Sequence, residues 1–457
     1  MMNEAPITTA KSALRSIRLD KVVQADGEIP LNAQRSTLNP QPSTLRIALL
    51  TGGGDKPYAL GMAAALTSVG LHVDFIGSDD LSVPELLSND RVKFLNLRGD
   101  QSEHASLMAK GLRVLSYYTR LIVYAATATP KLLHILWNNK FQLFDRTLLM
   151  VYYKLLAKRV VFTAHNVNAG KRDQNDSWLN RVTLKIQYNL SEHIFVHTDE
   201  MKDEMVTEFR IPEDKISVIP FGINNTVPNT TLSIAEARRQ LSIRDEDKAL
   251  LIFGHIGPYK GLEYLVAALV ELLKREGAYR LIIAGNPKGS KDYWKQIQKA
   301  IARHGIRDRV IEKIEYIPDE ATELYFKAAD VLILPYAHVF QSGVLFLGYS
   351  FGLPAIAADV GSLKEEIIEG VTGFVSRARD STDLARTIER YFCSELFHNL
   401  ETRRAEIKAY ANERYSWSKV ANITTRVYSE LLVADHAHVL HREGEKAGEA
   451  PTAGSVQ

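Results

Sequence analysis

The sequence predicts an α/β protein with two doubly wound parallel sheets. In both halves of the 457-residue chain, short apolar runs typical of buried strands alternate with longer runs whose leucines recur at helical spacing. A glycine turn at Gly222 and a polar segment up to Ser233 separate the two sets, as an interdomain linker does. We therefore expect two Rossmann-like domains that face a central cleft.

The two ends of the chain lack this alternation. Residues 1–44 mix Thr, Ser, Asn, Gln and Pro without a lasting period, and residues 435–457 end in a run of Gly, Ala, Pro, Thr and Ser. Such compositions favour disorder, so we expect a disordered extension at each end. The N-terminal domain should cover 45–228 and the C-terminal domain 229–414.

The N-terminal domain should begin with a strand over 46–50, a helix over 58–69 and a strand over 71–77. The turn after the first strand, Thr51-Gly52-Gly53-Gly54, lacks the glycine spacing of the dinucleotide fingerprint. Gly53 and Gly54 either allow a close approach of the backbone to a ligand or to the other domain, or serve backbone conformation alone.

Later strands of this domain are expected at 159–164, 194–198 and 216–220, and the first of them ends in His165 and Asn166. Ligands of open α/β sheets bind beyond the carboxyl ends of the strands. A histidine at this place holds or deprotonates a hydroxyl group, unless its hydrogen bonds only stabilise the loop.

The C-terminal domain should contain strands over 249–253, 280–284, 310–314, 331–334 and 355–358. A glycine-rich turn from Gly254 to Gly261 joins the first of these strands to a helix over 262–273 and carries Lys260. Helix N-termini offer unpaired N–H groups and a partial positive charge, to which Lys260 adds a full charge. This pattern indicates a diphosphate site, with an ordinary βα loop and a solvated lysine as the alternative.

Composition narrows the possible partners and compartment. The formal net charge is +2, so bulk charge does not favour a polyanion, and we expect no nucleic-acid partner. The only cysteine, Cys393, excludes a disulfide within the chain and favours a reducing compartment. The first residues lack the pattern of a signal peptide, and no uncharged apolar run reaches the ~18 residues of a spanning helix. We expect a cytoplasmic protein.

The segment over 105–161 is unusually basic. It carries nine Lys and Arg residues against one acid, Asp145, and interleaves them with aromatic and aliphatic residues. This mixture suits the surface of an anionic bilayer, and would place the protein at the inner face of the membrane. Core helices with solvated basic edges are the alternative interpretation.

From about Leu45 to Leu432, the chain resembles the retaining family-4 glycosyltransferases of GT-B architecture. The resemblance rests on motifs that follow one another in order, at 52–54, 163–166, 218–223, 254–261, 329–335, 351–354, 359–365 and 370–374. It implies that Tyr415-Ser416-Trp417 opens a helix, over 415–434, that crosses back onto the N-terminal domain.

The resemblance implies a hexosyltransferase that moves a sugar from a nucleotide sugar to a glycan or lipid-linked acceptor. A leaving phosphate oxygen would take the acceptor proton, so neither a protein nucleophile, a cofactor nor a metal is expected, and Asp245-Glu246-Asp247 is interpreted as a charged turn. His165 and Lys260 are the expected catalytic residues. The expected donor-binding residues are Gly53, Gly54, Asn166, Gly222, Gly254, His255, Lys260, Gln341, Ser342, Gly343 and Glu366.

Three positions depart from the family pattern. Val339 and Leu347 stand where the family usually has two glutamates, the second of which holds the nucleotide ribose, so Gln341 or Glu366 would have to supply that contact. His255 replaces the usual arginine, which leaves a clamp of Lys260 and a titratable histidine. Ser342 could cap the helix over 344–351, whose free N–H groups would bind the donor.

These departures leave three functions open. The first is an active sugar transferase. The second is a non-catalytic GT-B partner protein that binds a nucleotide sugar or a glycan, which the missing glutamates favour. The third is a phosphorolytic or sugar-phosphate enzyme of the same architecture.

Overall fold

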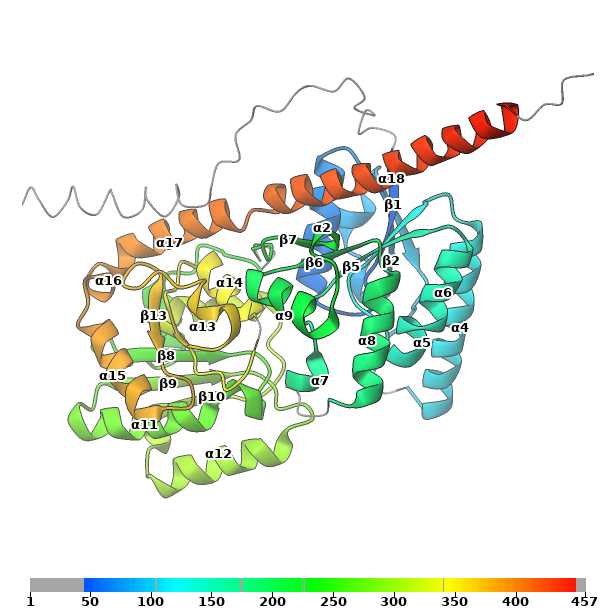
Figure 1. Ribbon diagram of the computed structural model, residues 1–457. Coiled ribbons are helices and arrows are strands. Elements are labelled where there is room, and N and C mark those ends of the chain that lie inside the picture. Colours follow the sequence, from blue (N-terminus) through cyan, green and yellow to red (C-terminus); the bar gives the residue numbers. More distant parts are fainter. Residues whose placement is uncertain are drawn as a thin grey trace, which may run out of the picture. The chain divides into compact units, whose positions relative to one another are not determined.

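The computed structural model describes residues 45–102, 105–172, 176–223, 225, 227–339 and 341–448, without the side chains of 107, 172 and 434–448. It contains the two predicted parallel sheets, each flanked by helices (Figure 1). The disorder predicted for 1–44 and 449–457 falls outside the described residues.

The N-terminal sheet has seven parallel strands in the order β3-β2-β1-β4-β5-β6-β7. Its strands are β1 (Arg46–Leu50), β2 (His72–Gly77), β3 (Val92–Asn96), β4 (Leu132–Ile135), β5 (Arg159–Thr163), β6 (His193–Val196) and β7 (Ile216–Val218). The helices are α2 (Lys56–Ser68), η2 (Asp79–Leu81), α3 (Pro84–Leu87), α4 (Leu107–Thr127), α5 (Gln142–Arg146), α6 (Leu148–Leu155), α7 (Ala169–Arg172), α8 (Trp178–Leu190), α9 (Asp199–Phe209) and η3 (Glu213–Lys215).

The C-terminal sheet has six parallel strands in the order β10-β9-β8-β11-β12-β13. Its strands are β8 (Lys248–Phe253), β9 (Tyr279–Ala284), β10 (Val310–Lys313), β11 (Val331–Leu334), β12 (Ala355–Ala358) and β13 (Gly373–Ser376). The helices are α10 (Ile234–Gln240), η4 (Pro258–Lys260), α11 (Leu262–Arg275), α12 (Lys291–Arg303), η5 (Arg307–Arg309), α13 (Asp319–Ala328), α14 (Gly343–Ser350), η6 (Gly361–Lys364), α15 (Ser381–Phe392), α16 (Glu395–His398), α17 (Leu400–Arg414) and α18 (Trp417–Gly448).

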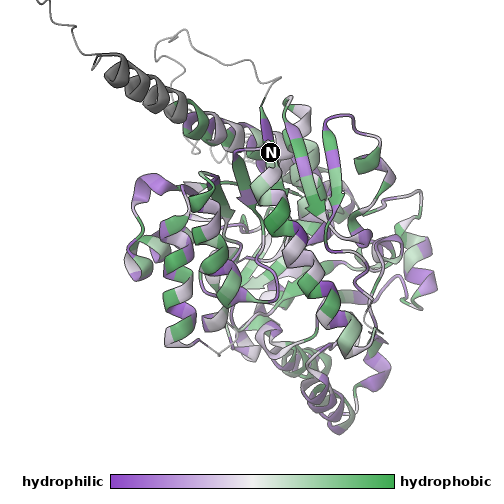
Figure 2. Ribbon diagram, turned by 90° about the vertical axis from the view of Figure 1, so that its right-hand side faces the viewer, coloured by the Kyte–Doolittle hydropathy of each residue, from purple (hydrophilic) through white to green (hydrophobic). Residues whose placement is uncertain are grey.

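Both faces of the N-terminal sheet are buried. Strand β1 sends Ala48 and Leu50 into one apolar cluster and Ile47 and Leu49 into another. This double burial is typical of parallel sheets, and it explains why the strands read as continuous apolar runs. The surface helices are hydrophobic on one side and hydrophilic on the other, as Figure 2 shows. Among the described residues, no helix is both long and apolar enough to cross a membrane.

The last helix, α18, packs against α2, as the resemblance implied. Its residues Val420, Val427 and Tyr428 are buried in the core of the N-terminal sheet. Disorder from residue 435 was a wrong expectation as far as Gly448, because α18 continues to that residue. The physical reason is that strong helix formers such as Ala, Leu and Glu continue through this segment, whereas the next proline is Pro451.

The basic segment over 105–161 is only partly a surface structure. Leu132–Ile135 forms strand β4, and all four of its residues are buried. Tyr117 and Tyr118 of α4 are also buried. A buried strand of three apolar residues and His134 therefore interrupts the helices of this segment.

Candidate active site

The loop after β8 brings the lysine of the predicted diphosphate site back onto the strand that it follows. Lys260 Nζ donates a hydrogen bond of 2.8 Å to the backbone oxygen of Phe253, the last residue of β8, and lies 5.2 Å from the ring centroid of Tyr336. Gly254 leaves room for the ammonium, because a Cβ there would lie 3.3 Å from Nζ. Gly261 has φ +64° and a backbone that touches Pro335, so no other residue fits there without strain.

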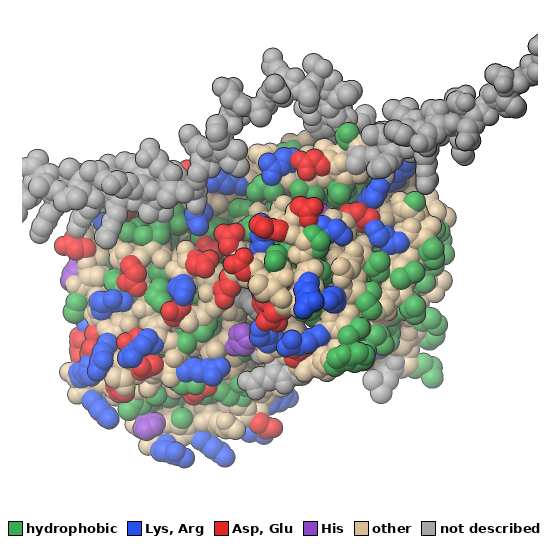
Figure 3. Space-filling view, in the orientation of Figure 1, with side chains coloured by type: hydrophobic (Ala, Val, Ile, Leu, Met, Phe, Trp, Pro, Cys, Tyr) green, Lys and Arg blue, Asp and Glu red, His purple; other side chains and the backbone are tan. Residues whose placement is uncertain are grey.

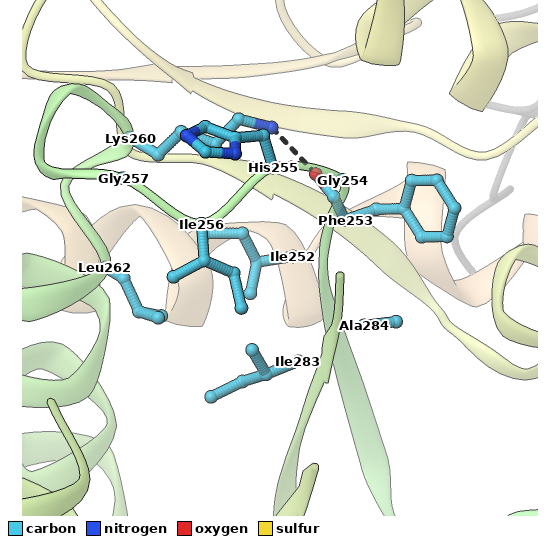
Figure 4. A pocket seen from close by; sticks show the side chains of 10 residues that line it. All are labelled: Ile252, Phe253, Gly254, His255, Ile256, Gly257, Lys260, Leu262, Ile283 and Ala284. Atoms are coloured by element: carbon cyan, nitrogen blue, oxygen red, sulfur yellow. Dashed lines mark hydrogen bonds between the residues drawn. The ribbon is translucent and has the colours of Figure 1, made fainter. Parts of the chain in front are cut away.

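The Lys260 side chain is buried, with 5% of its surface exposed. It forms no ion pair with any carboxylate of the described residues, and burial lowers the pKa of its ammonium group. A cavity of about 10 Å³ adjoins it, which is room for about one water-sized group. Figure 4 shows His255 beside Lys260, with apolar side chains such as Ile256 and Ile283 beneath them. A diphosphate would enter only if Lys260 leaves Phe253.

His255 is exposed and its ring is nearly parallel to that of Tyr259, with centroids 6.1 Å apart. The structure therefore brings His255, Lys260 and Gly254 together at the carboxyl end of β8, as predicted. Only His255 of the two cationic candidates faces solvent.

Four further predicted residues lie at and near the start of α14. Ser342 occupies the N-cap position, but its side chain does not cap the helix, because its hydroxyl lies 3.2 Å from the Tyr336 hydroxyl. Gly343 begins α14. Gln341 Nε2 lies 3.5 Å from Glu366 Oε1, and the Gln341 amide oxygen is buried without a partner among the described residues.

Glu366 is committed to a contact inside its own domain. It is buried, its carboxylate accepts a short hydrogen bond from the Tyr415 hydroxyl, and burial raises its pKa. Val339 and Leu347, at the positions of the family glutamates, are buried in the apolar core of the C-terminal sheet. Binding of the ribose by Glu366 therefore requires that a ligand displace or share the Tyr415 contact.

In the N-terminal domain, His165 lies among aromatic rings at the carboxyl edge of the sheet. Its ring stacks on Trp137, with centroids 4.1 Å apart and an interplanar angle of 5°. Tyr58, near the start of α2, meets the same ring edge-on at 4.6 Å. Trp137, His165 and His197 follow β4, β5 and β6, so three adjacent strands build this site.

The hydrogen bonds of the two histidines define their tautomers. His197 Nδ1 lies 3.2 Å from the Ile219 carbonyl oxygen, which can only accept, so His197 carries its proton on Nδ1. Its Nε2 therefore accepts from His165 Nδ1, at 2.9 Å. Burial lowers the pKa of His197 to about 4 and that of His165 well below the ordinary value, so both rings are neutral at pH 7.

This arrangement leaves a lone pair on His165 Nε2, which is buried without a hydrogen-bond partner among the described residues. A neutral imidazole with a strongly lowered pKa is a weak base, but it is a good acceptor for a hydroxyl group. Of the two roles considered for His165, the geometry favours holding a hydroxyl. Asn166 is half-buried next to it, and its side chain makes no hydrogen bond with the described residues.

Three predicted glycines are covered by side chains of the protein itself. A Cβ at Gly53 would meet the Arg98 guanidinium group, and one at Gly54 would meet the Trp137 ring. A Cβ at Gly222 would meet the Trp417 ring at 2.4 Å. The missing side chain of Gly222 makes room for Trp417, the first residue of α18, and its contact with the donor stays a prediction.

Sequence reasoning missed His197, Trp137 and Arg98. A signal for His197 was present, because it ends the strand next to the one that ends in His165.

The expectation of a charged turn at Asp245-Glu246-Asp247 is confirmed, since Asp247 pairs with Arg244 at 2.9 Å and with Arg280 at 3.2 Å.

Comparison with known families covers both domains. The family model for Glycosyltransferase Family 4 matches residues 52–226, and the model for Glycosyl transferases group 1 matches residues 233–414. The chain belongs to glycosyltransferase family 4. Curated relatives match about half of the chain, which in turn spans 57% and 66% of the length of two of them. They include an uncharacterized glycosyltransferase of Methanocaldococcus jannaschii, 29% identical over 50% of this chain and 57% of its own length. A D-inositol 3-phosphate glycosyltransferase of Corynebacterium efficiens is 26% identical over 60% of this chain and 66% of its own.

Solved structures confirm the GT-B fold over most of the chain. Sucrose-phosphate synthase from Thermosynechococcus elongatus superimposes with a TM-score of 0.67 and 19% identity, over 85% of this chain and 100% of that one. The HepE protein of Anabaena, solved in complex with UDP-glucose, superimposes with a TM-score of 0.64 and 18% identity, over 84% and 100% of the two chains. At these identities the likeness establishes the fold alone.

Proposed function

We propose that this family-4 protein transfers a hexose from a nucleotide sugar to a glycan or lipid-linked acceptor, with retention of anomeric configuration. The observation that carries the proposal is the buried ammonium of Lys260. An ammonium without a carboxylate partner is costly to bury, and here its partner is one backbone oxygen and the face of Tyr336. Such a site is suited to an anion that arrives from outside, and a nucleoside diphosphate is the anion that family membership suggests.

During transfer, positive charge builds on the sugar and negative charge on the departing diphosphate. Lys260, with His255 and the N–H groups at the start of α14, would stabilise that negative charge. A phosphate oxygen of the leaving group would take the proton of the attacking hydroxyl, so the acceptor attacks the face from which the nucleotide leaves. His165 would hold a hydroxyl of the donor sugar or the acceptor through Nε2.

The test is a screen of nucleotide sugars for release of the nucleoside diphosphate, with and without cell lipid extract. Release that depends on the donor supports the transferase. Two other results select the alternatives. Binding without release selects a non-catalytic partner protein, which the apolar burial of Val339 and Leu347 favours. Dependence on free phosphate selects a phosphorolytic enzyme.

We further propose that the N-terminal domain docks on an anionic membrane through a surface that we call the α4–α6 face. Its residues are exposed and apolar: Met108, Leu112, Leu115, Val123, Phe141, Leu143, Leu148, Val151 and Leu155. Tyr152 of α6 donates to the backbone oxygen of Ile122 of α4 at 3.1 Å, so the two helices are neighbours. Figure 3 shows hydrophobic side chains gathered at the right-hand edge, where these helices lie in Figure 1.

The helical spacing supports one continuous apolar stripe. Met108, Leu112 and Leu115 lie four and three residues apart on α4, and are 78%, 62% and 66% exposed. Arg120 is an exposed cation of the same helix, and each cation near an anionic surface adds about 1 kcal/mol. Purified protein should float with vesicles of anionic lipid and be released at high salt. Absence of flotation at low salt would contradict membrane docking.

A further inference from the structure

A second pocket, of about 40 Å³, opens at the carboxyl edge of the N-terminal sheet. Four cationic side chains contribute to its lining: Arg98, Lys110, Arg113 and Lys140. Arg98 follows β3 and Lys140 follows β4, so the pocket occupies the edge at which open α/β sheets bind ligands. The other two cations come from the first turns of α4.

Three of these four cations, Arg98, Arg113 and Lys140, have no carboxylate partner in the described part of the chain. Arg113 instead donates a short hydrogen bond to the backbone oxygen of Asp100, and Arg98 lies 5.9 Å from the ring centroid of Tyr117. Backbone and ring contacts hold the guanidinium groups in place without neutralising them.

Among the described residues, the carboxylates of Asp145 and Asp100 lie near the pocket, and neutral donors hold both of them. Asp145 accepts from the Tyr118 hydroxyl at 2.8 Å and from the backbone N–H of Asn139 at 2.7 Å. The Asp100 carboxylate accepts from the backbone N–H of Ser102 at 2.7 Å. The pocket therefore keeps an excess of positive charge.

A continuous series of contacts joins this pocket to His165. The Arg98 guanidinium occupies the place of a Cβ at Gly53, the Trp137 ring does the same at Gly54, and Trp137 stacks on His165. A molecule anchored by its charged end in the pocket would have to pass over or displace Arg98 and Trp137 to reach the lone pair of His165 Nε2. This is the path that an acceptor needs if its hydroxyl is to reach the transferred sugar.

We propose that this pocket binds a phosphate group of the acceptor, so that the acceptor is a phosphate ester. The inference rests on the proposed transferase function and names its substrate class. A phosphate monoester carries a charge of about −1.5 to −2 at pH 7, which suits several cations better than a single carboxylate does. Guanidinium groups match phosphate oxygens in geometry. The cavity holds roughly three water-sized groups, which suits a group as small as a phosphate.

The phosphate can belong to a lipid headgroup or to a soluble sugar phosphate. Lys110 and Arg113 share α4 with the exposed residues Met108, Leu112 and Leu115 of the α4–α6 face, but at helical spacing they lie on the opposite side of the helix, so a headgroup in the pocket would have to pass around α4 to place its acyl chains at that face. A soluble ester would use the pocket without the face. The chemistry of recognition is the same in both cases.

The experiment measures the dissociation constant of glycerol 3-phosphate by calorimetry, with glycerol as the uncharged reference. Wild-type protein should bind glycerol 3-phosphate, and Arg113→Gln/Lys140→Gln should weaken binding at least about tenfold. The matched control is Lys185→Gln, which removes an exposed cation of α8 outside the pocket and should leave binding unchanged. Vesicles of phosphatidic acid, compared with phosphatidylcholine, should compete if the source is lipid; failure to compete assigns a soluble ester.

Binding of UDP separates this inference from the proposed function. UDP affinity should be the same in wild type, in Arg113→Gln/Lys140→Gln and in Lys185→Gln, because none of these residues adjoins Lys260. If UDP binds but neither glycerol 3-phosphate nor phosphatidic acid does, the phosphate pocket is refuted and the transferase stands. Equal affinity of the double variant and wild type for glycerol 3-phosphate refutes it as well. If UDP itself does not bind to wild type, the transferase proposal falls.

Discussion

Replacing Lys260 by Met separates the function of the ammonium from its effect on stability. Met keeps much of the aliphatic volume of the side chain and removes the charge. In the structure, the buried ammonium has one hydrogen bond, to the Phe253 oxygen, and no carboxylate partner among the described residues. Since burying such a charge is unfavourable, Lys260→Met should leave the free energy of unfolding unchanged or raise it.

Ligand binding should respond in the opposite direction. Losing one member of a buried charge pair costs about 2–5 kcal/mol, which is roughly 30-fold to several thousand-fold in the dissociation constant. Calorimetric titration with UDP measures this loss, and denaturant unfolding measures stability on the same samples. Lys274→Met, which changes an exposed residue of α11, is the matched control and should alter neither quantity.

The pH dependence gives an independent check. Burial lowers the pKa of Lys260 below the ordinary lysine value of 10.5, so the ammonium loses its proton earlier than a solvated lysine as pH rises. UDP affinity of wild type should therefore fall as pH rises towards 10.5, and Lys260→Met should lack this fall. A variant that binds UDP like wild type, or that loses binding only because it unfolds, would refute the assignment of Lys260 to the diphosphate.

Three further predictions concern the N-terminal domain. His197→Phe removes the acceptor of the His165 Nδ1 proton, so His165 should no longer be held in one tautomer and turnover should fall about tenfold. Imidazole ¹⁵N shifts report the tautomer of His165. An unchanged tautomer in this variant would contradict the hydrogen bond from His165 to His197. Burial lowers the pKa of His134 to about 3, so the unfolded state binds a proton that the folded state excludes as pH falls below 6.5. The free energy of unfolding should therefore decrease as pH is lowered below 6.5. His134→Gln should reduce the slope of this free energy against pH by about 1.4 kcal/mol per pH unit in denaturant titrations. Trp417→Ala should lower the free energy of unfolding by about 3 kcal/mol. Gly222→Ala should destabilise the Trp417→Ala variant far less than it destabilises wild type, because the added Cβ then meets no indole ring. Additive effects in this double-mutant cycle would refute the contact between Gly222 and Trp417.

The fold could be predicted from the sequence wherever strands are buried on both faces. Strand β1 begins and ends where the apolar run predicted it, and β8, β9, β11 and β12 lie within a residue of their predicted ends. Strand β3, by contrast, is at the edge of its sheet. It has Lys93 and Asn96 at exposed positions and no fully buried residue, so its sequence shows no continuous apolar run. Strand β4 was missed because its three apolar residues and His134 continue a basic, aromatic segment that is helical on either side.

The site could be predicted only as far as strand ends and glycines reveal it. Lys260 and His165 were found because each follows a buried strand. The partner of His165, His197, depends on the register between β5 and β6, which one sequence does not define. The contact of Gly222 with Trp417 could not be predicted, because Trp417 lies far along the chain, in α18.

The return of α18 has a consequence for how the protein is made. Tyr428 is completely buried against His134 of β4, and Val420 and Val427 fill the same apolar cluster. A ribosome synthesises the N-terminal sheet first but supplies these core residues only after the whole C-terminal sheet has emerged. The earlier-made half must therefore keep an open apolar seam until α18 is made, and the later-made half can close its own core before that.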